Sequence, residues 1–223
     1  MNEIVFICST LIALALPMIS ARFGYGALCA CLVFLTMMTL VITAFIVDLF
    51  GFALSAGIIF FAAIFLLTDI VSEIYGHKKA YFMAITAIIV NILFVTLGFV
   101  ITSMIPLDSS PVIEGIRAFF TFIPRLLAGG IIAFALSQLI DIYVFGKFRK
   151  VTNGKHLWLR NIGSTSISQF FDTALFVLIA FYGVLPTEIL FEVFVTGYVA
   201  KVIIALCDTP FCYIARYVAV KKE

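Results

Sequence analysis

Charged residues are scarce in this 223-residue sequence, where Lys, Arg, Asp and Glu make up 12% of the chain. In a soluble domain these four residue types make up about 25% of the chain, so an ordinary cytosolic enzyme is excluded. The formal net charge is only +2, which gives no reason to expect a nucleic-acid partner. Histidine is limited to His77 and His156, and neither an HExxH motif nor a Cys/His cluster is present. No metal site is therefore predicted.

Other motifs of catalysis are missing as well. The chain has no GxxxxGK(S/T) phosphate loop, which excludes ATP hydrolysis by that route. Ser168 with Lys201 is the least unsuitable nucleophile–base pair, and nothing in its spacing favours it. The cysteines are odd in number, lie in apolar stretches and are interpreted as packing residues. We therefore predict neither an enzyme nor a cofactor.

Apolar residues dominate instead, at 64% of the chain with a mean hydropathy of +1.24. A membrane-spanning helix uses about 20 mostly apolar residues, so this amount would fill roughly seven of them. The first run begins Met1-Asn2-Glu3 without the basic segment of a cleavable signal peptide, and it is expected to stay in the membrane. The fold class predicted is all-α, a polytopic membrane helical bundle.

The predicted spans are bounded by charges, Gly or Pro, and together they form a single transmembrane domain over residues 1–223. They cover residues 3–20, 27–48, 51–75, 79–104, 119–145, 161–184 and 188–217. A tight turn at Asp48–Gly51 joins the second and third spans. The segments 105–118 and 146–160 are predicted to be linkers, the second of them rich in Lys and Arg.

Loop charges predict the orientation of the chain. With the C-terminus in the cytoplasm, most of the 14 Lys and Arg residues fall on the inner side, and Arg117 is the only loop cation on the outer side. This distribution follows the positive-inside rule for seven spans with the N-terminus out and the C-terminus in.

Four ionisable residues lie well inside the predicted spans, namely Asp69, Arg125, Asp172 and Lys201. Each charge near the bilayer centre costs about 2.5–3.5 kcal/mol on insertion scales. We therefore expect these residues to pair with one another, to face a cavity, or both. Salt bridges that only hold the bundle together are the structural alternative.

Helical spacing adds further polar side chains to this set. Thr165, Ser168 and Asp172 follow a three-to-four-residue step on the sixth span, with Gln169 beside them. The third, fifth and seventh spans contribute one polar cluster each, and the residues concerned are Asp69 and Glu73, Gln138 and Asp141, and Tyr198 and Lys201.

Three features bear on helix geometry. Arg125 lies about 140° around a straight helix from Gln138, so it either has a different partner or the span bends at Gly129–Gly130. These glycines could equally allow close helix packing. Pro210 is expected to disturb the last span, because it removes one intrahelical hydrogen bond.

Three segments in a fixed order carry a resemblance to a known family. Thr68–Gly76, Ser137–Phe145 and Ser168–Thr173, followed by Lys201, resemble the vitamin uptake transporter family, whose bacterial members are queuosine precursor transporters. The resemblance covers roughly residues 30–217. It implies a multi-pass protein of the bacterial inner membrane, with a six-helix core related to the substrate-binding subunits of ECF vitamin transporters and an extra N-terminal helix.

The resemblance further implies import of 7-cyano-7-deazaguanine or 7-aminomethyl-7-deazaguanine. A carboxylate can accept both donors of a deazaguanine edge, and an amide or a cation can answer its O6 atom. The substrate-binding residues expected are therefore Asp69, Glu73, Arg125, Gln138, Asp141, Gln169, Asp172, Tyr198 as a stacking ring, and Lys201.

Two other functions stay open at this point, a substrate-binding subunit that requires a separate ATPase module and a structural membrane subunit without a ligand. The partners expected are a 7-deazapurine small molecule and the lipid bilayer. The sequence leaves the oligomeric state open, a homodimer included.

Overall fold

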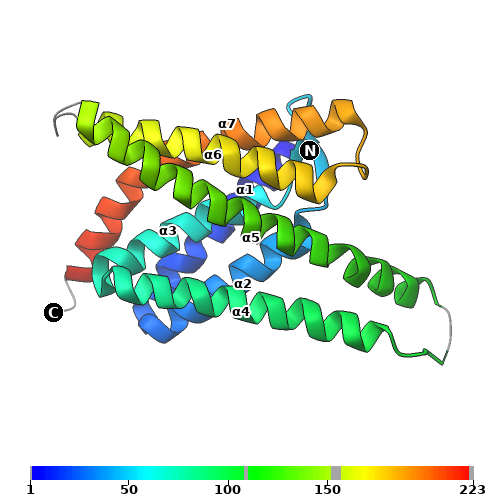
Figure 1. Cartoon of the computed structure of the whole chain (residues 1–223). Coiled ribbons are helices and arrows are strands. Elements are labelled where there is room, and N and C mark those ends of the chain that lie inside the picture. Colours follow the sequence, from blue (N-terminus) through cyan, green and yellow to red (C-terminus); the bar gives the residue numbers. More distant parts are fainter. Residues whose placement is uncertain (1, 108–109, 152–156, 221–223) are drawn as a thin grey trace.

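The computed structural model describes residues 2–107, 110–151 and 157–220, with most side chains up to residue 204. The chain forms a helical bundle with one small β-hairpin, and a short 3-10 turn at Ala21–Phe23 joins the first two helices (Figure 1). The elements are α1 (Asn2–Ser20), α2 (Tyr25–Ile42), β1 (Ile46–Leu49), β2 (Phe52–Ser55), α3 (Ile58–Tyr75), α4 (His77–Thr102), α5 (Pro111–Val151), α6 (Leu157–Phe181) and α7 (Thr187–Val220).

Each predicted span overlaps one of the helices α1–α7, and the ends of α1, α4, α6 and α7 agree with the prediction to within a few residues. Among the described residues, four stretches are long and apolar enough to cross a membrane: Asn2–Phe23, Tyr25–Ile42, Lys78–Thr102 and Pro111–Ser137. The protein is a multi-pass helical membrane protein. The count of seven crossings stays a prediction.

The predicted spans 27–48 and 51–75 are wrong at the ends that face each other. Helix α2 already stops at Ile42, α3 starts only at Ile58, and the antiparallel hairpin β1–β2 lies between them. Leu49 pairs with Phe52 around a two-residue turn in which Phe50 and Gly51 both have positive φ, at 56° and 82°. Such turns match the twist of a hairpin. Hydropathy could not reveal the two strands of this hairpin, because a short apolar strand and an apolar helix can have the same composition.

Helix α5 is longer than the predicted span 119–145. It contains 41 residues and includes residues 111–118 and 146–151 of the two segments predicted to be linkers, 105–118 and 146–160. At 1.5 Å per residue it is about 60 Å long, roughly twice the thickness of the hydrocarbon core, so its charged end need not lie in the membrane. The predicted disturbance at Pro210 is not an interruption, since α7 runs without a break to Val220.

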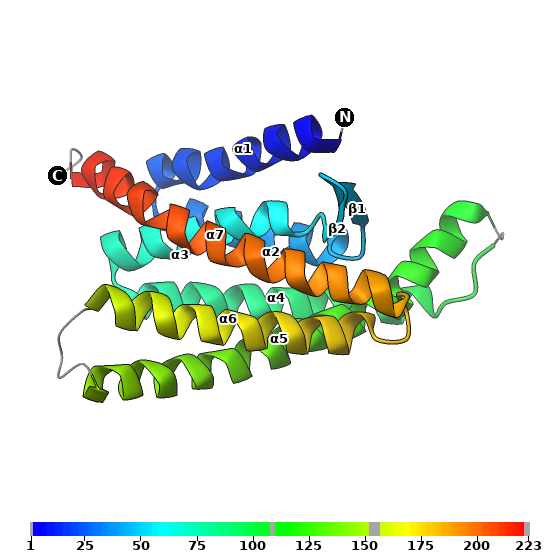
Figure 2. The ribbon, with the colours of Figure 1, turned by 90° about the horizontal axis from the view of Figure 1, so that it is seen from above.

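The helices bury two apolar clusters. One lies among α1, α2, α3 and α4, and the other among α2, α4, α5, α6 and α7. The start of α1 and the end of α7 lie at opposite ends of the bundle, with the hairpin at the end where α1 begins (Figure 2). Close packing of α5 on α6 accounts for Gly129, where a Cβ would lie 3.3 Å from Ile179 Cγ2. The alternative of close packing is therefore supported at Gly129.

Candidate substrate-binding site

An ion pair between α6 and α7 forms the centre of the candidate site. Lys201 Nζ lies 2.5 Å from Asp172 Oδ2, and the two side chains are only 12% and 13% exposed. A buried charge without a partner is strongly destabilising, so each residue requires the other. The expectation that the intramembrane charges pair is confirmed for these two residues.

Two further helices complete the surroundings of this pair. Ser137 of α5 is buried, and its hydroxyl lies 3.4 Å from Asp172 Oδ1 and 3.0 Å from the Phe134 carbonyl. Phe61 of α3 offers its ring to the ammonium of Lys201, with 4.7 Å between Nζ and the ring centroid. The pair is therefore held by α3, α5, α6 and α7 together.

Gln169 supplies a free acceptor one helical turn before Asp172. Its Oε1 atom is buried and has no hydrogen-bond partner among the described residues. A buried acceptor without a partner costs about 1–3 kcal/mol, so such atoms call for an explanation. An N–H group of a ligand would satisfy it.

Three aromatic residues of α6 and α7 lie close in the sequence to these polar groups. Phe170 follows Gln169, and its ring meets those of Tyr198 and Phe194 edge-on, with centroid distances of 5.6 and 5.3 Å. Tyr198, predicted to stack on the ligand, thus already packs against an aromatic neighbour on one side. Rings in this arrangement are worth about 0.5–1.5 kcal/mol beyond their buried area.

Arg125 has a different partner from the other predicted site residues. Its Nε donates to the Ile179 carbonyl at 2.6 Å and its Nη2 to the Tyr182 carbonyl at 2.5 Å. These are carbonyls at the C-terminal end of α6, which the helix itself leaves without donors. The guanidinium thus satisfies a helix end, and it is not part of the Asp172–Lys201 pair.

Four predicted site residues have side chains outside the described residues: Asp69 and Glu73 on α3, and Gln138 and Asp141 on α5. Their roles stay predictions. Among the described side chains, no group of three or more His, Cys, Asp or Glu residues could hold a metal ion.

Sequence reasoning missed several polar or aromatic contacts. The contact of Phe61 with Lys201 could not be predicted, because nothing in the sequence distinguishes Phe61 from the other Phe residues, 25 in all. Asn91 of α4 is buried and donates to Thr36 Oγ1 at 2.9 Å; a lone amide in an apolar span was a signal of the kind used for Asp172. Glu192 and Thr196 of α7 contact Ala53 of the hairpin, and without a predicted hairpin no partner could be expected for them.

The chemistry available is that of polar recognition inside a membrane. A carboxylate accepts hydrogen bonds, an ammonium donates them and a buried amide oxygen accepts one more, all within one turn of α6 or across to α7. Residues 55–215, which contain all these groups, match the family model described as "Putative vitamin uptake transporter". The chain belongs to this family. The resemblance read from the three segments is thereby confirmed, and α1 and α2 lie outside the matched residues.

Relatives in three bacteria carry more specific names. A protein of Bacillus subtilis named "Probable queuosine precursor transporter" is 33% identical over 177 residues, which cover 76% of this chain and 75% of the relative. A "Queuosine precursor transporter" of Escherichia coli is 28% identical, with 72% and 71% covered. A relative in Haemophilus influenzae is 29% identical, with 60% and 54% covered. No solved structure matches the chain.

Proposed function

We propose that the protein imports queuosine precursors, 7-cyano-7-deazaguanine or 7-aminomethyl-7-deazaguanine, across the bacterial inner membrane. The observation that carries the proposal is the buried Asp172–Lys201 pair, together with the buried Gln169 oxygen that has no partner among the described residues, one helical turn before Asp172. Proteins that share the family and are named queuosine precursor transporters give the substrate class.

The groups of the site complement a deazaguanine edge. Asp172 would accept from N1–H and the exocyclic amine, while Lys201, which has three N–H donors, would keep Asp172 as one partner and serve O6 as well. Gln169 Oε1 would take a remaining donor. Tyr198 and Phe170 would form the aromatic wall, because stacking on a base contributes about 1–3 kcal/mol in nucleic-acid systems.

The proposed architecture has seven crossings, with the N-terminus outside and the C-terminus in the cytoplasm, and a six-helix core of the kind found in ECF substrate-binding subunits. The odd number of crossings agrees with the start of α1 and the end of α7 at opposite ends of the bundle. The positive-inside distribution of Lys and Arg supports the same orientation.

Thermal unfolding of the detergent-purified chain with 7-cyano-7-deazaguanine tests the binding step. A ligand at 100 times its dissociation constant that binds only the folded state adds about 2.7 kcal/mol, a clear rise in melting temperature. We expect this rise with the 7-deazaguanine, and not with biotin or in Asp172→Asn. A folded protein that responds to no 7-deazapurine would refute the proposal.

Uptake of the labelled precursor into proteoliposomes tests the transport step. Accumulation with the purified chain alone is the expected result. Binding without uptake, together with an ATPase that copurifies from native membranes, would instead identify a substrate-binding subunit.

A further inference from the structure

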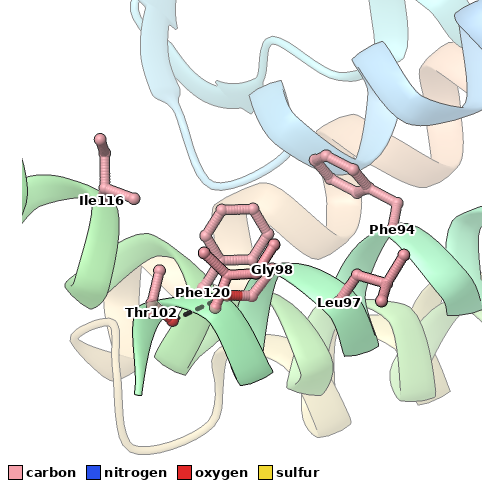
Figure 3. A pocket seen from close by; sticks show the side chains of 7 residues that line it. Phe94, Leu97, Gly98, Thr102, Ile116 and Phe120 are labelled. Atoms are coloured by element: carbon pink, nitrogen blue, oxygen red, sulfur yellow. Dashed lines mark hydrogen bonds between the residues drawn. The ribbon is translucent and has the colours of Figure 1, made fainter. Parts of the chain in front are cut away.

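A groove on the surface of the bundle lies between α4 and α5, away from the polar site. Its volume is about 320 Å³, and Figure 3 shows the side chains that form it, from Phe94 near one end to Ile116 near the other. It is lined by Phe94, Leu97, Gly98, Ile101, Thr102, Ile116 and Phe120. Leu97 and Ile101 are each 58% exposed, so the groove opens to the outside of the bundle.

The floor of the groove depends on Gly98. A Cβ built on this residue would lie 1.9 Å from the Phe120 ring, so only glycine lets that ring rest against the backbone of α4. Phe120 in turn packs against Phe94, with 5.5 Å between the ring centroids. The groove is therefore a fixed, aromatic-floored channel with apolar walls.

A cation lies at one end of this channel. Arg117 donates to the Thr102 carbonyl at 3.2 Å and to the Met104 carbonyl at 2.5 Å, and Thr102 itself lines the groove. A guanidinium has five N–H groups, so three are left for another acceptor. Among the described residues, no carboxylate forms an ion pair with Arg117.

We propose that this groove holds one acyl chain of a membrane phospholipid, whose phosphodiester binds Arg117. Both walls belong to stretches apolar enough to cross a membrane, Lys78–Thr102 and Pro111–Ser137, so the bilayer is the medium in front of the groove. An apolar channel that ends at a cation complements an anionic head group joined to a hydrocarbon chain. A sugar or a free anion would leave one of these two parts unmatched.

Fluorescence quenching by brominated lipid tests this proposal on the full chain. Trp158, the only tryptophan, is replaced by Phe, and a reporter is introduced by Leu97→Trp inside the groove. Phe99→Trp is the matched control, because Phe99 is 53% exposed on the same helix but does not line the groove. Each variant is reconstituted in phosphatidylcholine with increasing fractions of phosphatidylglycerol that carries brominated chains.

The groove reporter should reach half-quenching at a mole fraction about fivefold lower than the control, the ratio expected for one favourable Arg–lipid contact. Arg117→Gln should abolish this difference, and Arg117→Lys should retain most of it. Coincident curves for the two reporters would overturn the proposal. Weaker quenching in the groove than at the control would also overturn it and indicate cover by protein, such as a second copy. A difference that persists in a folded Arg117→Gln variant would refute the role of Arg117.

Discussion

The hydroxyl of Thr196 lies 2.7 Å from the carbonyl of Ala53 and at the same distance from the carbonyl of Glu192, so its single proton is shared between the β-hairpin and the helix that carries Lys201. The same residue of the hairpin is bound a second time, because the Ala53 N–H donates to Glu192 Oε2 at 3.2 Å. Glu192 and Thr196 are one turn apart on α7, so the N–H and the carbonyl of Ala53 both contact the same face of this helix. Two contacts to Ala53 therefore join the hairpin to α7.

Replacing Thr196 by Val removes the hydroxyl and keeps the shape of the side chain. We expect a loss of about 0.5–1.5 kcal/mol in the free energy of unfolding, the usual net worth of one hydrogen bond. Thr121→Val is the matched control, since that hydroxyl bonds only the Arg117 carbonyl of its own helix. Chemical denaturation in detergent measures both, and equal losses would contradict a specific role of the hairpin contact.

Glu192→Ala should expose the second bond to hydrogen exchange. The Ala53 amide then loses its acceptor, and its exchange with deuterium should become faster in a peptide that covers residues 52–55. Glu188→Ala, a change in the first turn of the same helix, should leave this exchange unchanged. Unaltered exchange in the Glu192 variant would show that another group protects the amide.

The Asp172–Lys201 pair should show strong coupling between its two residues. Lys201→Met leaves the Asp172 carboxylate buried without its partner, which is expected to cost about 3–5 kcal/mol of unfolding free energy. The double variant Asp172→Asn with Lys201→Met should recover much of this loss, because no unpaired charge is left. Uptake of the precursor should be lost in both variants. A double variant that transports normally would mean that the pair serves stability alone.

Arg125 should matter for stability more than for substrate binding. Arg125→Met removes two charged donors from the C-terminal carbonyls of α6, where such hydrogen bonds are worth about 1.5–3 kcal/mol each. We expect a lower melting temperature, yet the same additional shift on ligand binding. Arg125→Lys keeps the charge and should restore part of the stability. Loss of binding without any loss of stability would instead put Arg125 at the ligand.

The partnership of Asp172 with Lys201 was predictable because a charge in an apolar span is costly and few countercharges were available. For Arg125 the sequence left a different partner open, and the structure shows that this partner is the end of α6. A guanidinium can be satisfied by backbone carbonyls, and sequence does not reveal which helix end will come within its reach. Phe61 was beyond prediction for the same reason, since its role depends on how α3 and α7 meet.

Hydropathy located the helices and failed at the hairpin. The residues from Ile42 to Ile58 are nearly as apolar as the helices on either side, and the turn at Phe50 uses a positive φ that is uncommon for a residue with a side chain. The tight turn itself was predicted at Asp48–Gly51, and the structure has it at Phe50 and Gly51. The two strands beside it were not predicted, because their apolar residues continue the composition of the neighbouring helices.

Gly98 and Gly130 offer a paired test of the α4–α5 contact. A methyl group on Gly98 must displace the Phe120 ring, so Gly98→Ala should lower the free energy of unfolding by about 1–3 kcal/mol, as overpacking does. Gly130→Ala meets no atom within 4 Å and lies inside α5, so it should be neutral or stabilise the protein by up to about 1 kcal/mol through helix propensity. Thermal unfolding of the two variants measures the difference. Equal effects would mean that the Phe120 ring can leave Gly98 without cost, and that the floor of the groove is not fixed.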